Sequence, residues 1–334
     1  MAIDLEVPRT DAAAILHATI SLAQPAQDRL DLSDIVTQLH AVRARWREQQ
    51  GRPREASGRE LPSREALVAI MDDLRGALFP MRLGPPDLHQ ESEDYFVGHT
   101  LDRALHALLA QIRLELRYHA RFAGKPTEPF DGRALSIARD FGAALPRLRE
   151  VLDTDVLAAY RGDPAARSVD EVLVCYPGLH AVIHHRIAHQ LHVLGVPLIA
   201  RIVAELAHAE TGIDIHPGAR IGSYFFIDHG TGVVVGETAV IGDNVRIYQA
   251  VTLGARRFET DADGVLHKGG ARHPIVEDDV VIYAGATVLG RITIGRGSSI
   301  GGNVWLTRSV PPDSRIAQAS AREDRGDVDA GRTS

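Results

Sequence analysis

Residues 275–306 read IVEDDVVIYAGATVLGRITIGRGSSIGGNVWL, and the architecture of the C-terminal half follows from this segment. Aliphatic residues recur in it at every sixth position: Val276, Ile282, Val288, Ile294, Ile300 and Leu306. A helix cannot use a period of six, whereas short strands that turn at corners present one aliphatic residue per repeat to a shared interior. The spacing therefore predicts a parallel β-helix built from hexapeptide repeats.

The same spacing continues toward the N-terminus in two earlier runs. Val235, Ile241, Ile247 and Leu253 keep one phase, and Ile215, Ile221, Ile227 and Val233 keep another that is shifted by two residues. The segment between Gly254 and Arg272 is polar, contains glycine and breaks the period. It is expected to leave the strands as a loop, where binding residues are often found. The repeat domain is expected over residues 211–312.

The N-terminal half has a different period. From about Leu30 to His208 apolar residues recur at spacings of three and four, which predicts amphipathic helices. We expect a flexible N-terminus over residues 1–29 and a helical domain over 30–210. Residues 313–334 hold almost no large apolar side chains, so a disordered tail is expected. The fold class is therefore α+β, with an all-helical domain followed by a parallel β-helix and a disordered C-terminal tail.

Composition excludes several classes of function. The 334 residues suit about two domains, and 37 Lys and Arg against 44 Asp and Glu give a net charge of -7. This charge disfavours binding to nucleic acid or to anionic membranes. The chain starts without a signal-like segment and contains no long apolar run, which predicts a cytoplasmic protein. The single cysteine, Cys175, allows neither an intrachain disulfide nor a thiolate metal site.

Acids, histidines and an arginine gather in short motifs. These are Asp214-Ile215-His216-Pro217, Ile227-Asp228-His229-Gly230, Val235-Gly236-Glu237-Thr238-Ala239 and Gly270-Ala271-Arg272-His273-Pro274, preceded by Gly162-Asp163-Pro164-Ala165 and Tyr176-Pro177-Gly178-Leu179-His180-Ala181. From about Ala158 to Pro312 the chain resembles the serine O-acetyltransferase family of hexapeptide acyltransferases. The resemblance implies a left-handed, triangular β-helix. It also implies acetyl transfer from acetyl-CoA to the hydroxyl of L-serine in a ternary complex, on the route to cysteine.

The reaction requires a base that removes a proton from an alcohol while its oxygen attacks a thioester. A neutral imidazole suits this task near pH 7, and His229 is the candidate. The resemblance implies that Asp214 orients this histidine. It further implies that Asp163 and Asp228 bind the serine ammonium and that Arg272 and His273 bind its carboxylate. The positions that match the acetyl-CoA contacts of the family are Ala255, Ala284 and Gly302. No metal is expected.

The resemblance also bears on assembly and regulation. It implies a homotrimer or a dimer of trimers with the active site between neighbouring faces, and feedback inhibition by L-cysteine in the serine site. Members of the family insert a terminal isoleucine into O-acetylserine sulfhydrylase. This chain ends in Thr333-Ser334, so that complex is not expected.

Three alternatives remain open from the sequence. A sister enzyme would acetylate homoserine or a sugar, and only Asp163, Asp228 and Arg272 argue against it. A zinc lyase of the γ-carbonic anhydrase type would use histidines gathered across a subunit interface, nominally His216, His229 and His273, although their spacing does not match that family. A catalytically silent scaffold would not need the set formed by Asp214, Asp228 and His229.

Overall fold

The computed structural model describes residues 31–51, 61–122, 130–257, 266 and 269–318. The chain divides into two compact units, Met1–Arg54 and Glu55–Ser334. The first unit contains the helix α1 (Ser33–Gln49), so the two units divide the range of the expected helical domain, residues 30–210. The predicted flexible N-terminus, residues 1–29, lies outside the described residues.

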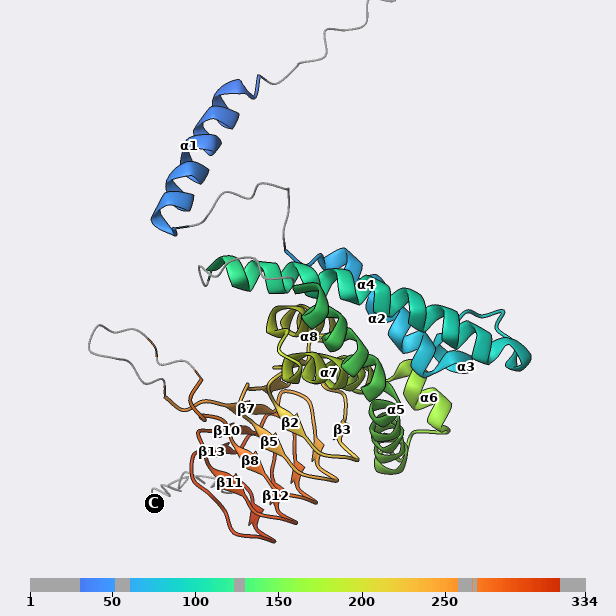
Figure 1. The fold of residues 1–334 in the computed structure, drawn as a ribbon. Coiled ribbons are helices and arrows are strands. Elements are labelled where there is room, and N and C mark those ends of the chain that lie inside the picture. Colours follow the sequence, from blue (N-terminus) through green and yellow to red (C-terminus); the bar gives the residue numbers. More distant parts are fainter. Residues whose placement is uncertain (1–30, 52–60, 123–129, 258–265, 267–268, 319–334) are drawn as a thin grey trace, which may run out of the picture. The chain divides into compact units, whose positions relative to one another are not determined.

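The second unit begins with the predicted helices (Figure 1). They are α2 (Arg64–Leu78), α3 (Pro80–Leu83), the 3-10 turn η1 (Gln90–Ser92), α4 (Glu93–Phe122), α5 (Phe130–Gly162), α6 (Val169–Cys175), α7 (Pro177–Val193) and α8 (Pro197–Thr211). The Ser63 hydroxyl caps α2 by accepting a hydrogen bond of 3.3 Å from the Ala66 N–H. Helix α8 ends at Gly212, whose φ of +70° lies in the left-handed region that glycine adopts without strain.

Short strands form the rest of the second unit. They are β1 (Asp214–Ile215), β2 (Arg220–Ile221), β3 (Phe226–Ile227), β4 (Val234–Val235), β5 (Val240–Ile241), β6 (Arg246–Ile247), β7 (Thr252–Gly254), β8 (Ile275–Val276), β9 (Val281–Ile282), β10 (Thr287–Leu289), β11 (Thr293–Ile294), β12 (Ser299–Ile300), β13 (Trp305–Leu306) and β14 (Arg315–Ile316). The first sheet has the order β1-β4-β7-β10-β13, the second β2-β5-β8-β11 and the third β3-β6-β9-β12-β14. All pairs are parallel, and strands β1 to β13 visit the three sheets in turn (Figure 1).

The hexapeptide period places one aliphatic side chain of each repeat in the interior. All six residues of the sixfold series from Val276 to Leu306 are buried. Three parallel sheets with this register agree with the predicted left-handed β-helix. The prism extends beyond the expected boundary at residue 312, because β14 pairs with β12 and sets Ile316 opposite Ile300. The remaining part of the expected tail, residues 319–334, lies outside the described residues.

The shift of phase has a structural origin. The inward residues Ile227 and Val235 are eight positions apart instead of six, so the corner between β3 and β4 contains two additional residues. His229 and Gly230 adopt left-handed φ angles of 59° and 93° in this corner. The enlarged corner therefore carries the candidate base. The second break, between β7 and β8, contains the predicted loop, of which residues 258–265, 267 and 268 lie outside the described part.

A buried ion pair lies where the helices meet the prism. Helices α5 and α7 contact β3, and α8 contacts β1. Arg186 of α7 and Asp155 of α5 pair at 3.0 Å, and the Asp155 carboxylate also accepts the Phe225 N–H at 2.9 Å. The Arg186 guanidinium donates to the carbonyls of Ile221 and Gly222. Because both charges are paired and hydrogen-bonded, burying them is tolerated. No helix in the described ranges has the length and apolar character needed to cross a membrane.

Candidate active site

The predicted site residues divide between two corners of the prism. Asp228 and His229 lie at the corner where the chain passes from the third sheet to the first, and we call it the His229 corner. Arg272 and His273 lie where the chain passes from the first sheet to the second, and we call it the Arg272 corner. Each strand of the first sheet runs from the His229 corner to the Arg272 corner.

Strand register sets a column of residues along the His229 corner. Ile227 pairs with Ile247, Ile247 with Ile282, and Ile282 with Ile300. The second residue after each of these is, in order, His229, Gln249, Ala284 and Gly302. The candidate base therefore shares a corner with two of the three residues expected at acetyl-CoA. Ala255 instead follows β7 at the Arg272 corner.

Asp163 joins the His229 corner from the end of α5. The Tyr176 hydroxyl donates to its Oδ2 at 2.5 Å, and the Ala165 N–H donates to Oδ1 at 2.8 Å. The hydrogen bond from Tyr176 is the main reason that the pKa of Asp163 is lowered, and the Ala165 N–H and the nearby Arg246 guanidinium lower it further. The same hydrogen bond raises the pKa of Tyr176 to about 12. Asp163 is thus held as an anion.

Asp228 lies beside a second cation. The Arg246 guanidinium is 3.9 Å from Asp228 Oδ2 and stacks 4.9 Å from the centre of the Phe226 ring. The His229 Nδ1 is 3.8 Å from Asp228 Oδ1, and the His229 side chain is 70% exposed. The corner therefore combines two carboxylates with an accessible imidazole.

Asp214 lies near this corner without a direct bond to the candidate base. It pairs in register with Val234, in the strand that follows the His229 corner. Within the described residues, no hydrogen bond or ion pair joins the Asp214 carboxylate to the His229 imidazole. Its potential ligand atom instead lies within 4.8 Å of those of Glu205 and His208 on α8. The predicted dyad is therefore not formed as a hydrogen-bonded pair in this structure.

Thr238 organises the Arg272 corner. Its Oγ1 accepts the backbone N–H groups of Arg272 at 2.9 Å and His273 at 3.1 Å. The Thr238 N–H donates to His273 Nδ1 at 3.1 Å, and the Thr238 hydroxyl lies 2.9 Å from the same atom. The Arg272 guanidinium is fixed by Glu237, whose Oε2 lies 2.6 Å from Nη2. A single threonine therefore positions both residues expected at the substrate carboxylate.

His273 is held as a neutral hydrogen-bond donor. Because its Nδ1 accepts the Thr238 N–H, the ring proton resides on Nε2. Burial, followed by the nearby Arg272 charge, lowers the pKa of His273 to about 4. The ring lies against Gly236, where an added Cβ would come within 2.0 Å of His273 Cδ2. This close approach explains the glycine before Glu237 and Thr238.

The two corners stay separate in one chain. No hydrogen bond or ion pair in the described ranges connects Asp163, Asp228 or His229 with Arg272 or His273. The histidines considered for a zinc lyase divide in the same way, since His216 lies at the Arg272 corner with His273. Among the described residues, the one group whose ligand atoms converge as for a metal is Glu205, His208 and Asp214.

Sequence reasoning missed three residues that shape these corners: Thr238, Tyr176 and Arg246. Thr238 and Tyr176 fall inside the quoted motifs, so their positions were available although their roles were not. Arg246 lies on the outward side of a regular repeat. Its pattern is that of an exposed charge, and no signal in the sequence places it beside Asp228.

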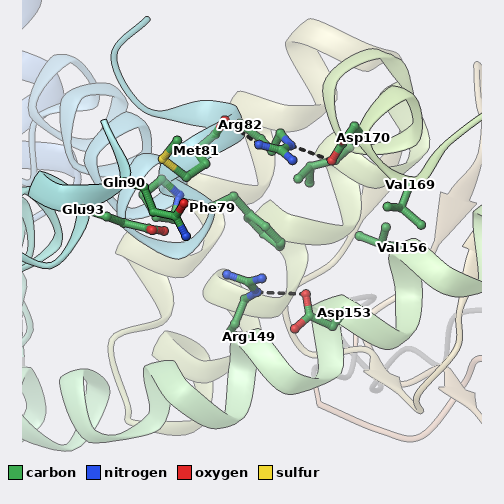
Figure 2. A pocket seen from close by; sticks show the side chains of 12 residues that line it. Phe79, Met81, Arg82, Gln90, Glu93, Arg149, Asp153, Val156, Val169 and Asp170 are labelled. Atoms are coloured by element: carbon green, nitrogen blue, oxygen red, sulfur yellow. Dashed lines mark hydrogen bonds and ion pairs between the residues drawn. The ribbon is translucent and has the colours of Figure 1, made fainter. Parts of the chain in front are cut away.

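A further pocket, of about 410 Å³, lies among the helices (Figure 2). Its arginines are paired with carboxylates, Arg82 with Asp170 at 2.5 Å and Arg149 with Asp153 at 2.8 Å. Phe79 forms part of its wall, with the Arg149 guanidinium 4.3 Å from the centre of its ring. None of the predicted site residues lines it. Its paired charges offer no constellation for acyl transfer.

A triangular prism of hexapeptide repeats with an imidazole at one corner is the architecture of hexapeptide transferases. The family described as bacterial transferase hexapeptide (six repeats) matches residues 273–308. The plasmid serine acetyltransferase of Synechococcus elongatus is 60% identical over 267 residues, which cover 79% of this chain and 84% of that protein. The chain therefore belongs to the serine acetyltransferase family, and the resemblance identified from the sequence is confirmed.

Other relatives agree with this assignment. Serine acetyltransferase of Mycobacterium tuberculosis is 52% identical over 162 residues, 48% of this chain and 67% of that protein. The crystal structure of Entamoeba histolytica serine acetyltransferase 1 with L-cysteine matches with a TM-score of 0.65 and 34% identity, covering 86% of this chain and 100% of that one. The isoform 3 structure from the same organism, with cysteine, gives 0.64 and 36%, covering 76% and 82%.

Proposed function

We propose that this protein transfers the acetyl group of acetyl-CoA to the hydroxyl of L-serine, giving O-acetyl-L-serine and CoA. The observation that carries the proposal is the division of charge between the two corners. Asp163 and Asp228 suit an ammonium group, whereas Arg272 and the Nε2–H of His273 suit a carboxylate. An α-amino acid carries both groups, and a sugar carries neither. The serine acetyltransferase relatives support the same substrate over homoserine and over the zinc lyase reaction.

His229 acts as the general base. Its exposed imidazole takes the proton of the serine hydroxyl while the oxygen attacks the thioester carbonyl. The tetrahedral intermediate then collapses, the carbon–sulfur bond breaks, and the imidazolium returns the proton to the CoA sulfur. Asp214, near the same corner, orients the imidazole and stabilises its charged form after a side-chain rotation. No acyl-enzyme is required.

Acetyl-CoA is the co-substrate of this reaction. The column formed by Gln249, Ala284 and Gly302 leads away from His229 along one corner and has small side chains at its last two positions. We assign the contacts with the pantetheine arm to Ala284 and Gly302. Ala255, at the other corner, would contact acetyl-CoA bound to a neighbouring copy.

A complete site requires two copies of the chain. Because β4 separates the two corners, we assign the His229 corner to one copy and the Arg272 corner to its neighbour, in a homotrimer or a dimer of trimers. L-cysteine shares the ammonium and carboxylate of serine, so it would occupy the same groups as a feedback inhibitor. The Entamoeba histolytica enzymes whose structures contain cysteine support this regulation.

The test is CoA release from acetyl-CoA by the purified protein with L-serine, beside L-homoserine and a sugar acceptor. We expect release that depends on serine and falls by about 10²–10⁴-fold in His229→Ala, since a positioned base contributes that much. Release with homoserine or the sugar in preference to serine would overturn the substrate. Unchanged release by His229→Ala would overturn the role of His229.

A further inference from the structure

A cluster of metal-ligating side chains joins the end of α8 to Asp214 of the candidate site. Glu205 and His208 are three residues apart in the last turns of α8, so they lie on the same side of the helix. The left-handed turn at Gly212 leads the chain into β1, which begins with Asp214. One ligand atom from each of Glu205, His208 and Asp214 lies within 4.8 Å of the other two. We call these three residues the α8 cluster.

The α8 cluster has an excess of negative charge. The Arg201 guanidinium is 2.6 Å from Glu205 Oε1, and the His208 Nδ1 is 3.3 Å from Oε2 of the same carboxylate. The Asp214 N–H donates to the Val233 carbonyl at 2.9 Å. Its carboxylate has no hydrogen bond or ion pair in the part of the chain that the structure describes. Two carboxylates that converge at the C-terminal end of a helix, where the helix dipole is negative, favour a cation between them.

The donor set indicates the class of cation. One imidazole nitrogen and two carboxylate oxygens are ligands that Zn²⁺ takes at about 2.0–2.2 Å, and similar divalent transition metals accept the same set. Tetrahedral ligation at this length places the ligand atoms about 3.4 Å apart, so side-chain rotations close the present spacing. Glu205 and His208 are 37% and 43% exposed, which leaves a path from solvent. Arg201 holds the second oxygen of Glu205, as outer contacts that orient a metal ligand do.

We propose that the α8 cluster binds a divalent transition metal, represented by Zn²⁺, and that the bound ion inhibits acetyl transfer. The inhibition rests on the proposed function, in which the Asp214 carboxylate rotates toward His229 and orients its imidazole. An ion that holds this carboxylate against α8 prevents the rotation. The groups assigned to serine lie outside the cluster, so the ion lowers kcat and leaves the KM for serine unchanged. The metal is therefore a regulator of the reaction and not its cofactor.

The first experiment measures Zn²⁺ binding to the full-length protein by equilibrium dialysis, without acetyl-CoA or serine. His208→Ala and Glu205→Gln each remove one ligand. The matched control, His106→Ala, removes the histidine of an exposed pair in α4, whose Asp102 lies 3.2 Å away and which has no third converging ligand among the described residues. We expect each cluster variant to bind one Zn²⁺ at least about tenfold more weakly than the parent, since even outer contacts contribute about 10–100-fold to metal affinity. The control should bind as the parent does. Parent-like binding by both cluster variants would overturn the site.

The second experiment measures how Zn²⁺ changes the initial serine-dependent rate, before the CoA thiol accumulates and binds the metal. Zn²⁺ should lower the kcat of the parent protein toward that of Asp214→Asn, and a chelator should restore it. In His208→Ala, half-inhibition should require at least about tenfold more Zn²⁺. Equal inhibition of His208→Ala and the parent, or a rise in the KM for serine in place of the fall in kcat, would overturn inhibition through Asp214. Absence of serine-dependent release from the metal-free parent would contradict the proposed function, whereas the dialysis would still decide whether the cluster binds metal.

Discussion

At the scale of single residues, the uncharged Thr238 makes the hydrogen bonds that position both predicted residues of the Arg272 corner. Its hydroxyl and backbone together contact both Arg272 and His273, and they select the tautomer of the histidine. The residue itself binds no charge. Its effect on substrate is transmitted through the two side chains it positions, which distinguishes it from a group that touches the reacting atoms.

We predict that Thr238→Val raises the KM for serine about 5–30-fold, because the lost hydrogen bonds are worth about 1–2 kcal/mol. The KM for acetyl-CoA should not change, and Thr238→Ser, which keeps the hydroxyl, should restore the parent value. Thr293→Val, at a similarly half-buried threonine of β11, is the matched control and should leave both constants unchanged. Steady-state kinetics in both substrates measures this. An equal rise in both KM values would indicate general damage to the prism instead of a positioning role.

At the scale of elements, α7 buries histidines in place of aliphatic residues. His184 and His185 are 3% and 2% exposed, and the His184 Nδ1–H donates to the His180 carbonyl at 2.9 Å. Burial lowers the pKa of His184 to about 4 and that of His185 well below its usual value. Both pKa values are therefore lower in the folded than in the unfolded chain. Below about pH 6.5 the unfolded chain binds more protons, so the free energy of unfolding falls with decreasing pH.

The prediction for α7 is a change in this pH dependence. His185→Phe removes one titrating group and a buried Nδ1 that has no hydrogen-bond partner in the described structure. The slope of the free energy of unfolding should decrease by about 0.7 kcal/mol per pH unit at pH 6.5, rising to about 1.3 kcal/mol per pH unit at pH 5. Denaturant unfolding at one protein concentration measures it. His106→Phe, at a 74% exposed histidine of α4, is the surface control. Equal slopes for His185→Phe and the parent would contradict the assignment of acid sensitivity to α7.

Particular elements also show which parts of the fold can be predicted from the sequence. The sixfold series predicts the prism because each repeat must bury one aliphatic side chain, and the shift of phase between Ile227 and Val235 marks the corner that carries His229. Asp155 and Arg186 carry no such signal. In an amphipathic pattern they look like surface charges, and only the packing of α5 and α7 on the prism buries them. The end of the prism was also missed, because Ile316 is a single apolar residue in a polar segment.

At the scale of the whole molecule, the separation of the two corners predicts that the active site forms between two copies of the chain. The motifs predicted which residues belong to the site, since they follow from a resemblance in sequence. They could not show that Asp228 and Arg272 lie at opposite ends of the first-sheet strands, because that depends on how the repeats turn. If the site forms between copies, two defective chains can complement each other.

We therefore predict activity from a mixture of inactive chains. His229→Ala and Arg272→Ala chains, co-expressed in equal amounts, should form hybrid rings in which about a quarter of the interfaces combine an intact His229 corner with an intact Arg272 corner. A chain carrying both substitutions, co-expressed with the parent chain, should also retain about a quarter of the parent activity. A site contained within one chain predicts no activity from the first mixture and about half from the second. The two serine-dependent rates, measured together, thus discriminate between the arrangements without any structure of the assembly.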